Sequence, residues 1–275
     1  MTTGDWTVPQ NWARFTAAEH AVWDRLFARQ SALLPGRASS AHLAGLDVLR
    51  LSKPGIPDFD ELSQRLHKLT GWTVVAVPGL VPDDVFFTHL ANRRFPAGNF
   101  IRRADQLEYL QEPDVFHDVF GHVPLLSHPV FADYMQAYGQ GGLRSLGLGA
   151  LHKLSWLYWY TVEFGLIREN GDLRISGAGI VSSSGETRFA LEDPSPNRIG
   201  FDLARILRTK YRIDDYQQAY FVIDSYDQLL RTTLDTDFGP LYAALEGMPD
   251  LAPDAILPSD VVINRGTQAY AAAKR

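Results

Sequence analysis

The sequence predicts an α+β fold that is predominantly α-helical and carries a small sheet. Two observations favour this class: apolar residues recur at helical spacing in most segments, and runs rich in β-branched residues are few and scattered. A doubly wound parallel sheet needs strands that alternate with helices, so that architecture is not expected. With 275 residues, 45% of them hydrophobic, the chain is long enough to build a substantial core.

Helical periodicity is clear from the first segment onwards. The segment 16–34 is amphipathic and is predicted to turn Ala21, Leu26, Phe27 and Leu33 towards the core. The other segments with a helical pattern are 58–69, 83–92, 130–138, 148–168, 201–209 and 225–233.

Strands are expected in a few short runs. The run WTVVAVPG after Gly71 is β-branched and is ended by Pro78 and Gly79. The remaining strand-like runs are 173–179, 187–192 and 219–223. The stretch 251–266 has little periodicity and is expected to pack as an extended tail.

Composition and charge exclude several classes of protein. A net charge of −6 leaves no basic excess to neutralise phosphates, which argues against a nucleic-acid partner. The chain has no cysteine, which excludes disulfides, Fe–S clusters and thiolate zinc sites. It also lacks a signal-like N-terminus and an apolar run of about 18 residues, so we expect a cytoplasmic protein without a membrane span.

The segment PDVFHDVFGHVP (113–124) places two histidines, His117 and His122, five positions apart. Residues on one face of an α-helix are three or four positions apart. Pro113 suits the start of a helix, and Gly121 suits the left-handed position after its end. We therefore predict a helix over 113–120 and a glycine turn that brings His122 back towards His117. Imidazole is a common metal ligand, although two unrelated polar residues are the alternative.

A second candidate ligand lies in LSWLYWYTVEFGLI (154–167), which is apolar almost all round and is predicted to be a buried helix. An ionised Glu163 there is costly unless a cation holds it, and the nearest basic residue, Arg168, is five positions away. A metal, a distant arginine or a neutral carboxyl group would each resolve this. Two histidines and one carboxylate form the set that holds non-heme Fe(II), and zinc is a second option although HExxH is absent.

Other polar residues have less specific interpretations. The segment 176–186 has the glycine and serine density of a turn but no nucleotide-binding arrangement. Surface or capping roles are predicted for the remaining histidines, His20, His42, His67, His89, His128 and His152.

Four stretches together resemble the pterin-dependent aromatic amino acid hydroxylases, most of all the compact bacterial members that act on phenylalanine. The resemblance runs from about residue 70 to 235, and the stretches are FIRR (100–103), EPDVFHDVFGHVPL (112–125), LYWYTVEFGL (157–166) and GAGIVSSSGE (177–186). It implies a single catalytic domain over 1–275, with a helical part (1–70), a core (71–235) and a tail (236–275). No regulatory domain is expected, and no tetramerisation helix, because two prolines interrupt 251–266.

The resemblance also assigns roles to residues. It implies that His117, His122 and Glu163 bind Fe(II) and act in catalysis. For the substrate it implies Arg102 at the carboxylate, with Tyr158, Trp159, Gly179 and Ser182 around the amino acid. For the pterin it implies stacking on Phe86 and backbone contacts from Gly79 and Val81. Two departures from the animal members are Leu110, in place of a substrate-contacting threonine, and Asp118, in place of a glutamate.

The implied reaction is hydroxylation of L-phenylalanine to L-tyrosine in phenylalanine catabolism. It uses O₂, a tetrahydropterin and Fe(II), and in the family it passes through a peroxypterin and an Fe(IV)-oxo species. We expect small-molecule partners only and a monomer. The residues alone leave three alternatives: a zinc-dependent hydrolase with the same ligands, a hydroxylase of tyrosine or tryptophan, and a helical binding protein with structural histidines.

Overall fold

The structure, a computed structural model, describes residues 4–107 and 112–274. Most of its regular structure is helical. The N-terminal part contains the 3-10 helix η1 (Trp12–Arg14) and helices α1 (Ala17–Leu33), α2 (Ser40–Val48), α3 (Phe59–Thr70) and α4 (Asp83–Ala91). The middle contains the π-helix η2 (Phe116–His122), α5 (Val123–Leu126), α6 (Pro129–Gly147), α7 (Leu151–Tyr158), the π-helix η3 (Trp159–Glu163), α8 (Ala178–Val181) and α9 (Ser184–Glu192). The last helices are α10 (Leu203–Ile206), α11 (Tyr226–Asp235), α12 (Phe238–Leu245) and α13 (Ala269–Ala272).

The strands form two small sheets. The larger sheet has the order β4-β3-β6-β5-β7, built from β3 (Leu166–Glu169), β4 (Asp172–Ile175), β5 (Asn197–Gly200), β6 (Ala219–Ile223) and β7 (Val262–Asn264). Strand β6 pairs in parallel with β3 and β5, whereas β4 and β7 add antiparallel edges. The second sheet is the parallel pair β1 (Thr73–Val77) and β2 (Arg94–Gly98). The predicted α+β class with a small sheet is confirmed.

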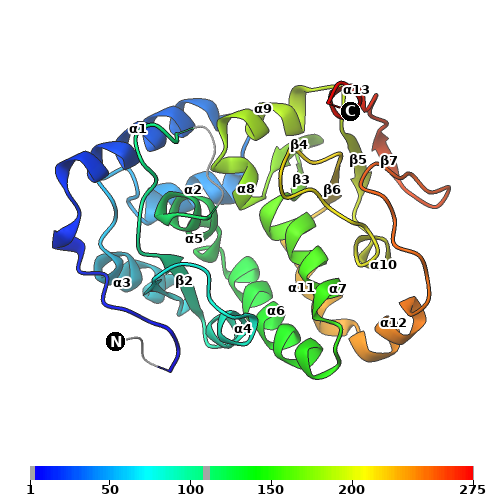
Figure 1. Ribbon diagram of the computed structural model, residues 1–275, viewed down its shortest axis with the longest axis horizontal. Helices are drawn as coiled ribbons and strands as arrows, with labels where there is room; N and C mark the ends of the chain where they lie inside the picture. The colour runs from blue at the N-terminus through cyan, green and yellow to red at the C-terminus, as the bar shows by residue number, and fades with distance from the viewer. Residues whose placement is uncertain (1–3, 108–111, 275) are drawn as a thin grey trace.

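In the view of Figure 1, α8 lies between helices α1 and α2 on one side and the larger sheet on the other, and α6 and α7 lie below. Buried apolar side chains form one cluster that runs through all three parts. Among the described residues, no helix combines the length and the apolar character that crossing a membrane requires.

Local signals explain why α1 and α3 were predicted well, whereas α2 was not predicted. Thr16 and Glu19 form a reciprocal capping box at the start of α1. The buried stripe of α1 includes Val22 and Leu26, whereas Ala21 is exposed, so its predicted burial was wrong. The side chain of Asp58 caps α3, and Gly71 ends it with φ of 76°.

Several predicted elements were wrong in type or extent. The strand predicted over 173–179 stops at Ile175, before α8. The helix predicted over 148–168 ends at Glu163, because the chain then turns into β3. The strand predicted over 187–192 is the helix α9, whose start Ser183 caps by accepting the N–H of Glu186. The turn predicted over 176–186 contains α8 and the start of α9.

The C-terminal part is more ordered than an extended tail. Helix α12 lies where no helix was predicted, and β7 pairs with β5 at the edge of the larger sheet. The side chain of Lys274 forms an ion pair with Asp215 at 2.8 Å, which ties the end of the chain to the loop before β6.

Candidate metal centre and amino acid pocket

The two histidines lie on one π-helical segment, η2, which runs on into α5. A π-helix closes its hydrogen bonds between residues i and i+5, so side chains five positions apart lie side by side. The Nε2 atoms of His117 and His122 are 3.2 Å apart. The predicted helix end at Gly121 was therefore wrong, although the convergence that it was meant to explain is present.

Gly121 is needed for close packing rather than for a left-handed turn. A Cβ atom at this position would lie 2.9 Å from the carbonyl oxygen of Ala178, which is the first residue of α8. Only a residue without a side chain lets η2 and α8 approach to this distance. This contact places the end of α8, with Ser182, beside His117.

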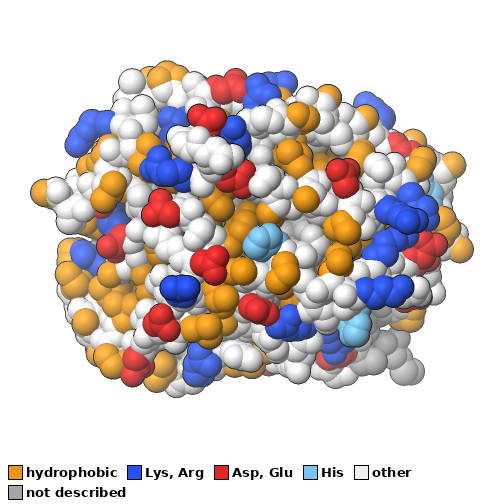
Figure 2. Space-filling view, turned by 180° about the vertical axis from the view of Figure 1, so that it is seen from behind, with side chains coloured by type: hydrophobic (Ala, Val, Ile, Leu, Met, Phe, Trp, Pro, Cys, Tyr) orange, Lys and Arg blue, Asp and Glu red, His pale blue; other side chains and the backbone are white. Residues whose placement is uncertain are grey.

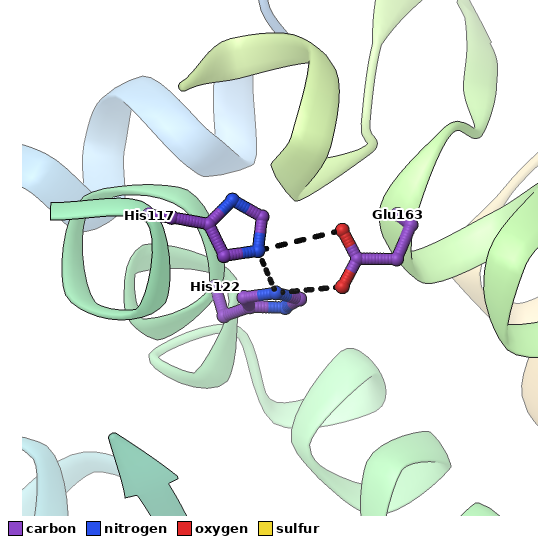
Figure 3. A group of neighbouring side chains, drawn as sticks. All are labelled: His117, His122 and Glu163. Carbon is purple, nitrogen blue, oxygen red and sulfur yellow. Dashed lines mark hydrogen bonds and ion pairs between the residues drawn. The ribbon is translucent and has the colours of Figure 1, made fainter. Parts of the chain in front are cut away.

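Glu163 is the last residue of η3 and faces both histidines (Figure 3). Its Oε1 lies 2.9 Å from Nε2 of His122, and its Oε2 lies 3.6 Å from Nε2 of His117. Two ligand atoms about 2.1 Å from one cation and at right angles to each other are about 3 Å apart. The three side chains thus have the spacing of three ligands on one face of a metal ion.

The hydrogen bonds around His117 favour metal binding. Ser182 Oγ donates its only proton to the carbonyl oxygen of Ala178 at 2.8 Å, so towards His117 Nδ1, 3.0 Å away, it acts as an acceptor. In the neutral form of the ring, which is the form that binds a metal, this puts the proton on Nδ1 and leaves the lone pair of Nε2 facing the centre. Two facing Nε2 atoms and a carboxylate form a donor set that fits a divalent cation.

The electrostatics of the cluster agree with this fit. Burial by itself raises the pKa of Glu163, but the imidazoles of His122 and His117 hold it well below its usual range. Burial lowers the pKa of His117, but the Glu163 carboxylate outweighs it and raises that pKa to about 9. The site therefore keeps Glu163 ionised and attracts positive charge, which a metal ion supplies.

Arg102 is buried rather than solvated, and an acidic partner already holds it. Its Nε and Nη2 each lie 2.8 Å from an oxygen of Asp114, whose side chain is fully buried. Nη1 makes no hydrogen bond to the residues that the structure describes. The guanidinium edge formed by Nε and Nη2 is thus occupied, which leaves Nη1 for an incoming anion. Its neighbour Arg103 is exposed and pairs with Asp105.

Trp159, the first residue of η3, lies in an aromatic cluster beside the ligands. Its ring is stacked on Tyr211, with centroids 4.1 Å apart, and lies 4.8 Å from Phe164. Gly179 packs against Phe164, whose ring leaves no room for a Cβ there. Trp159 and Gly179, both assigned to the amino acid pocket, are thus brought together around Phe164.

Tyr158 lies beside His122 and contacts Phe86. The hydroxyl of Tyr158 is 3.5 Å from Nδ1 of His122, and its ring centroid is 5.9 Å from that of Phe86 in α4. Gly79 and Val81 lie in the turn between β1 and α4. The three residues assigned to the pterin therefore belong to one short stretch, and Phe86 connects it to the metal cluster through Tyr158.

The ligand cluster is partly open to solvent, since the side chains of His117 and Glu163 are 19% and 14% exposed. Figure 2 shows a face of the molecule on which hydrophobic side chains gather around a histidine. Leu110 lies outside the described residues. Asp118 accepts the backbone N–H of Gly98 at 2.7 Å, which ties η2 to the end of β2.

Some residues of the site were missed at the level of sequence. Asp114 follows Pro113 in the histidine-containing motif, and a buried arginine calls for such a partner, so it could have been found. Gln217 accepts a hydrogen bond from the indole N–H of Trp159, and no sequence pattern near Gln217 indicates this contact. His42 and His89 are buried, which makes the surface role predicted for each of them wrong.

Three comparisons with known proteins show what this chain is similar to. The model of the biopterin-dependent aromatic amino acid hydroxylase family matches residues 7–235. A phenylalanine-4-hydroxylase of Caulobacter vibrioides is 63% identical over 269 residues, covering 98% of this chain and 91% of the relative. The crystal structure of Chromobacterium violaceum phenylalanine hydroxylase with iron(III) and 7,8-dihydrobiopterin has a TM-score of 0.91 and 54% identity, covering 95% of this chain and 94% of that chain. The structure of the same enzyme with iron and phenylalanine has a TM-score of 0.90 and 52% identity, covering 95% of both chains.

The family match spans most of the chain, and the relatives share more than half of its residues over nearly its whole length. The chain therefore belongs to the biopterin-dependent aromatic amino acid hydroxylases.

Proposed function

We propose that this protein is a phenylalanine 4-monooxygenase, which hydroxylates L-phenylalanine to L-tyrosine with O₂, a tetrahydropterin and non-heme Fe(II). The observation that carries the proposal is the convergence of His117, His122 and Glu163 from two π-helical segments. Family membership and the names of the relatives support the reaction and its substrate.

The three convergent side chains would hold the iron. Nε2 of His117, Nε2 of His122 and the carboxylate of Glu163 present three donors to one point, and the remaining coordination positions stay open. Ser182 holds the His117 ring in the tautomer that metal binding needs. When bound, the iron and the reduced pterin supply the activation of O₂ that ring hydroxylation requires.

The amino acid would be held at its carboxylate and around its ring. We assign the carboxylate to Arg102, whose Nη1 is unused while Asp114 fixes the rest of the guanidinium. Trp159 would form a wall of the ring pocket, and the aromatic surface around it would exclude water from the reacting carbon. We place Gly179, Ser182 and Tyr158 around the same amino acid.

The pterin would lie against Phe86, a half-buried ring on α4. A flat bicyclic cofactor gains most from stacking on an aromatic face, and Phe86 is the aromatic residue that follows the turn of Gly79 and Val81. We assign backbone contacts with the pterin to these two residues.

Family membership removes two of the alternatives that the residues alone left open, the zinc-dependent hydrolase and the non-enzymatic binding protein. Tyrosine and tryptophan remain as competing substrates. We place phenylalanine first because relatives with 55–63% identity are named phenylalanine-4-hydroxylases.

We also propose that the chain acts as one catalytic domain, as a monomer in the cytoplasm. The absence of cysteine suits a reducing compartment. Sedimentation at micromolar concentration tests the assembly: a single species of one chain is expected, and a stable tetramer would contradict it.

The reaction itself is tested by product analysis with ¹⁸O₂. Iron-loaded protein, L-phenylalanine and tetrahydrobiopterin should give L-tyrosine that carries one ¹⁸O atom on the ring. Tyrosine without the label, or no tyrosine at all, would refute the proposed function.

A further inference from the structure

Trp159 is held by the loop 211–217, which comes before β6 and carries no recognisable motif. Tyr211 lies parallel to the Trp159 ring, with an interplanar angle of 16°. At the other end of the loop, Oε1 of Gln217 accepts the indole N–H of Trp159 at 3.0 Å. One loop therefore contacts both a face and an edge of the same ring.

Gln217 is almost completely buried, with 1% of its surface exposed, and its amide has a defined orientation. The indole N–H can only donate, so the atom that faces it must be the amide oxygen. The amide nitrogen donates to the carbonyl oxygen of Arg212 at 2.7 Å, and the backbone N–H of Gln217 donates to Oε1 of Glu186 at 3.3 Å. Both ends of the side-chain amide and the backbone N–H are thus committed, and Oε1 faces the indole as its acceptor.

The loop is anchored to the rest of the fold independently of Trp159. Asp215 accepts hydrogen bonds from the hydroxyl of Tyr270 at 2.9 Å and from Nζ of Lys274 at 2.8 Å. Since the C-terminal segment and Glu186 fix the loop, the loop sets the position of the ring rather than following it.

We propose that Gln217 is a positioning residue that determines the specificity of the amino acid pocket by fixing the plane of the Trp159 ring. The proposal rests on the proposed function, because it takes Trp159 as a wall of that pocket. A ring held at one edge and on one face has a single orientation, so the pocket keeps a single width. Without the acceptor, the ring can turn, and the pocket discriminates less between a phenyl ring and a larger indole ring.

The variant Gln217→Met tests this, because methionine has a similar length and volume but cannot accept the indole proton in the same way. In the iron-loaded enzyme, the Kd for L-phenylalanine, measured by calorimetry, should rise about 5-fold, because a ring that is no longer held in the free enzyme must be ordered when the substrate binds. The preference in kcat/KM for L-phenylalanine over L-tryptophan should fall. Iron content and the pterin KM should stay unchanged.

The matched control is Gln218→Met, the same substitution one position later, where the side chain bonds to Gln268 of the C-terminal segment. It should leave phenylalanine binding unchanged. In a Trp159→Phe background there is no indole proton to accept, so Gln217→Met should then change the phenylalanine Kd by less than about twofold.

An unchanged Kd in Gln217→Met, or an equally large effect in the Trp159→Phe background, would overturn the proposal. If Gln217→Met does not fold, Tyr211→Leu removes the stacked ring and should weaken phenylalanine binding several-fold, whereas an unchanged Kd would contradict the proposed role of the loop. Failure of the proposed function is separate, since it would appear as wild-type enzyme that forms no tyrosine.

Discussion

The proposed metal ligands and the proposed wall of the amino acid pocket are held in place by different means. His117 and His122 share one π-helical segment, and Glu163 ends another, so main-chain geometry sets the positions of the ligands. The wall depends on single side-chain partners, such as Gln217 for Trp159.

This difference predicts two kinds of response to substitution. Loss of a ligand removes a bond that no neighbour can replace, and the effect should be close to all-or-none. Loss of a partner in the wall leaves the wall residue present but less well placed, so binding should weaken by degrees while the metal stays bound.

The largest effect is expected at the ligands. Glu163→Ala or His117→Ala should abolish stoichiometric iron binding and lower kcat/KM by more than about 100-fold. Mutation of residues that only orient metal ligands already lowers metal affinity or activity by about 10- to 100-fold. Iron content after purification measures this directly.

The control for the ligand variants is His42→Phe. His42 is also fully buried, but neither of its ring nitrogens has a hydrogen-bond partner among the described residues, and burial lowers its pKa to about 3. The variant should keep its iron. Normal iron content in Glu163→Ala would show that the ligand set is wrong.

The next largest effect is expected at Arg102. Arg102→Ala removes the charge proposed to hold the substrate carboxylate and should raise the phenylalanine KM by about 30- to 1,000-fold. Asp114→Asn keeps the arginine but weakens the ion pair that fixes its position, and it should raise the phenylalanine KM by about 10-fold. Steady-state kinetics measure both, with Arg103→Ala as the exposed control. If Arg103→Ala is the damaging change, the carboxylate site is displaced by one residue.

A smaller effect is expected at the pterin. Phe86→Ala should raise the pterin KM by about 10-fold and leave the phenylalanine KM almost unchanged, because only the stacking surface is lost. The exposed neighbour Thr88→Ala serves as the control. Equal effects on both KM values would mean that Phe86 is ordinary core.

The smallest effect on activity is expected at Glu186, where the readout is stability. Burial, opposed by the hydroxyl of Tyr220, raises the pKa of Glu186 to about 7. The folded protein therefore binds more protons here than the unfolded chain between about pH 4.5 and 7, so this residue makes stability fall as pH rises through that window. In the wild type, this effect should lower the free energy of unfolding by about 1–3 kcal/mol between pH 5 and pH 8. In Glu186→Gln this decrease should be absent, as measured by urea unfolding at the two pH values. Parallel pH dependence in both proteins would contradict this.

The sequence was sufficient to predict the convergence of His117, His122 and Glu163 and the strongly patterned helices. The spacing of His117 and His122 and the isolation of Glu163 in an apolar segment are enough to indicate a possible metal site. The π-helical form of the histidine segment could not be predicted in this way, because the sequence pattern does not distinguish a π-helix from an α-helix. The approach of α8 to Gly121 is a contact between distant segments and was not predicted either. Helix periodicity alone therefore led to a helix that ended too early.

The parts that sequence could not supply depend on long-range side-chain contacts. Gln217 and Trp159 are 58 residues apart, and nothing near either residue announces the hydrogen bond between them. Strand β5 was also missed, since it is short and includes Arg198, which is buried because it donates to the carbonyl oxygens of Ala190 and Asp193.

The central claim is that one Fe(II) held by His117, His122 and Glu163 makes this chain a phenylalanine hydroxylase. The most direct test is to strip the metal from the protein and titrate Fe(II) back while tyrosine formation is measured, with Zn(II) in a parallel titration. Activity should rise linearly, reach its plateau at one Fe(II) per chain, and stay absent with Zn(II). A plateau well above one equivalent, or equal activity with Zn(II), would contradict the account.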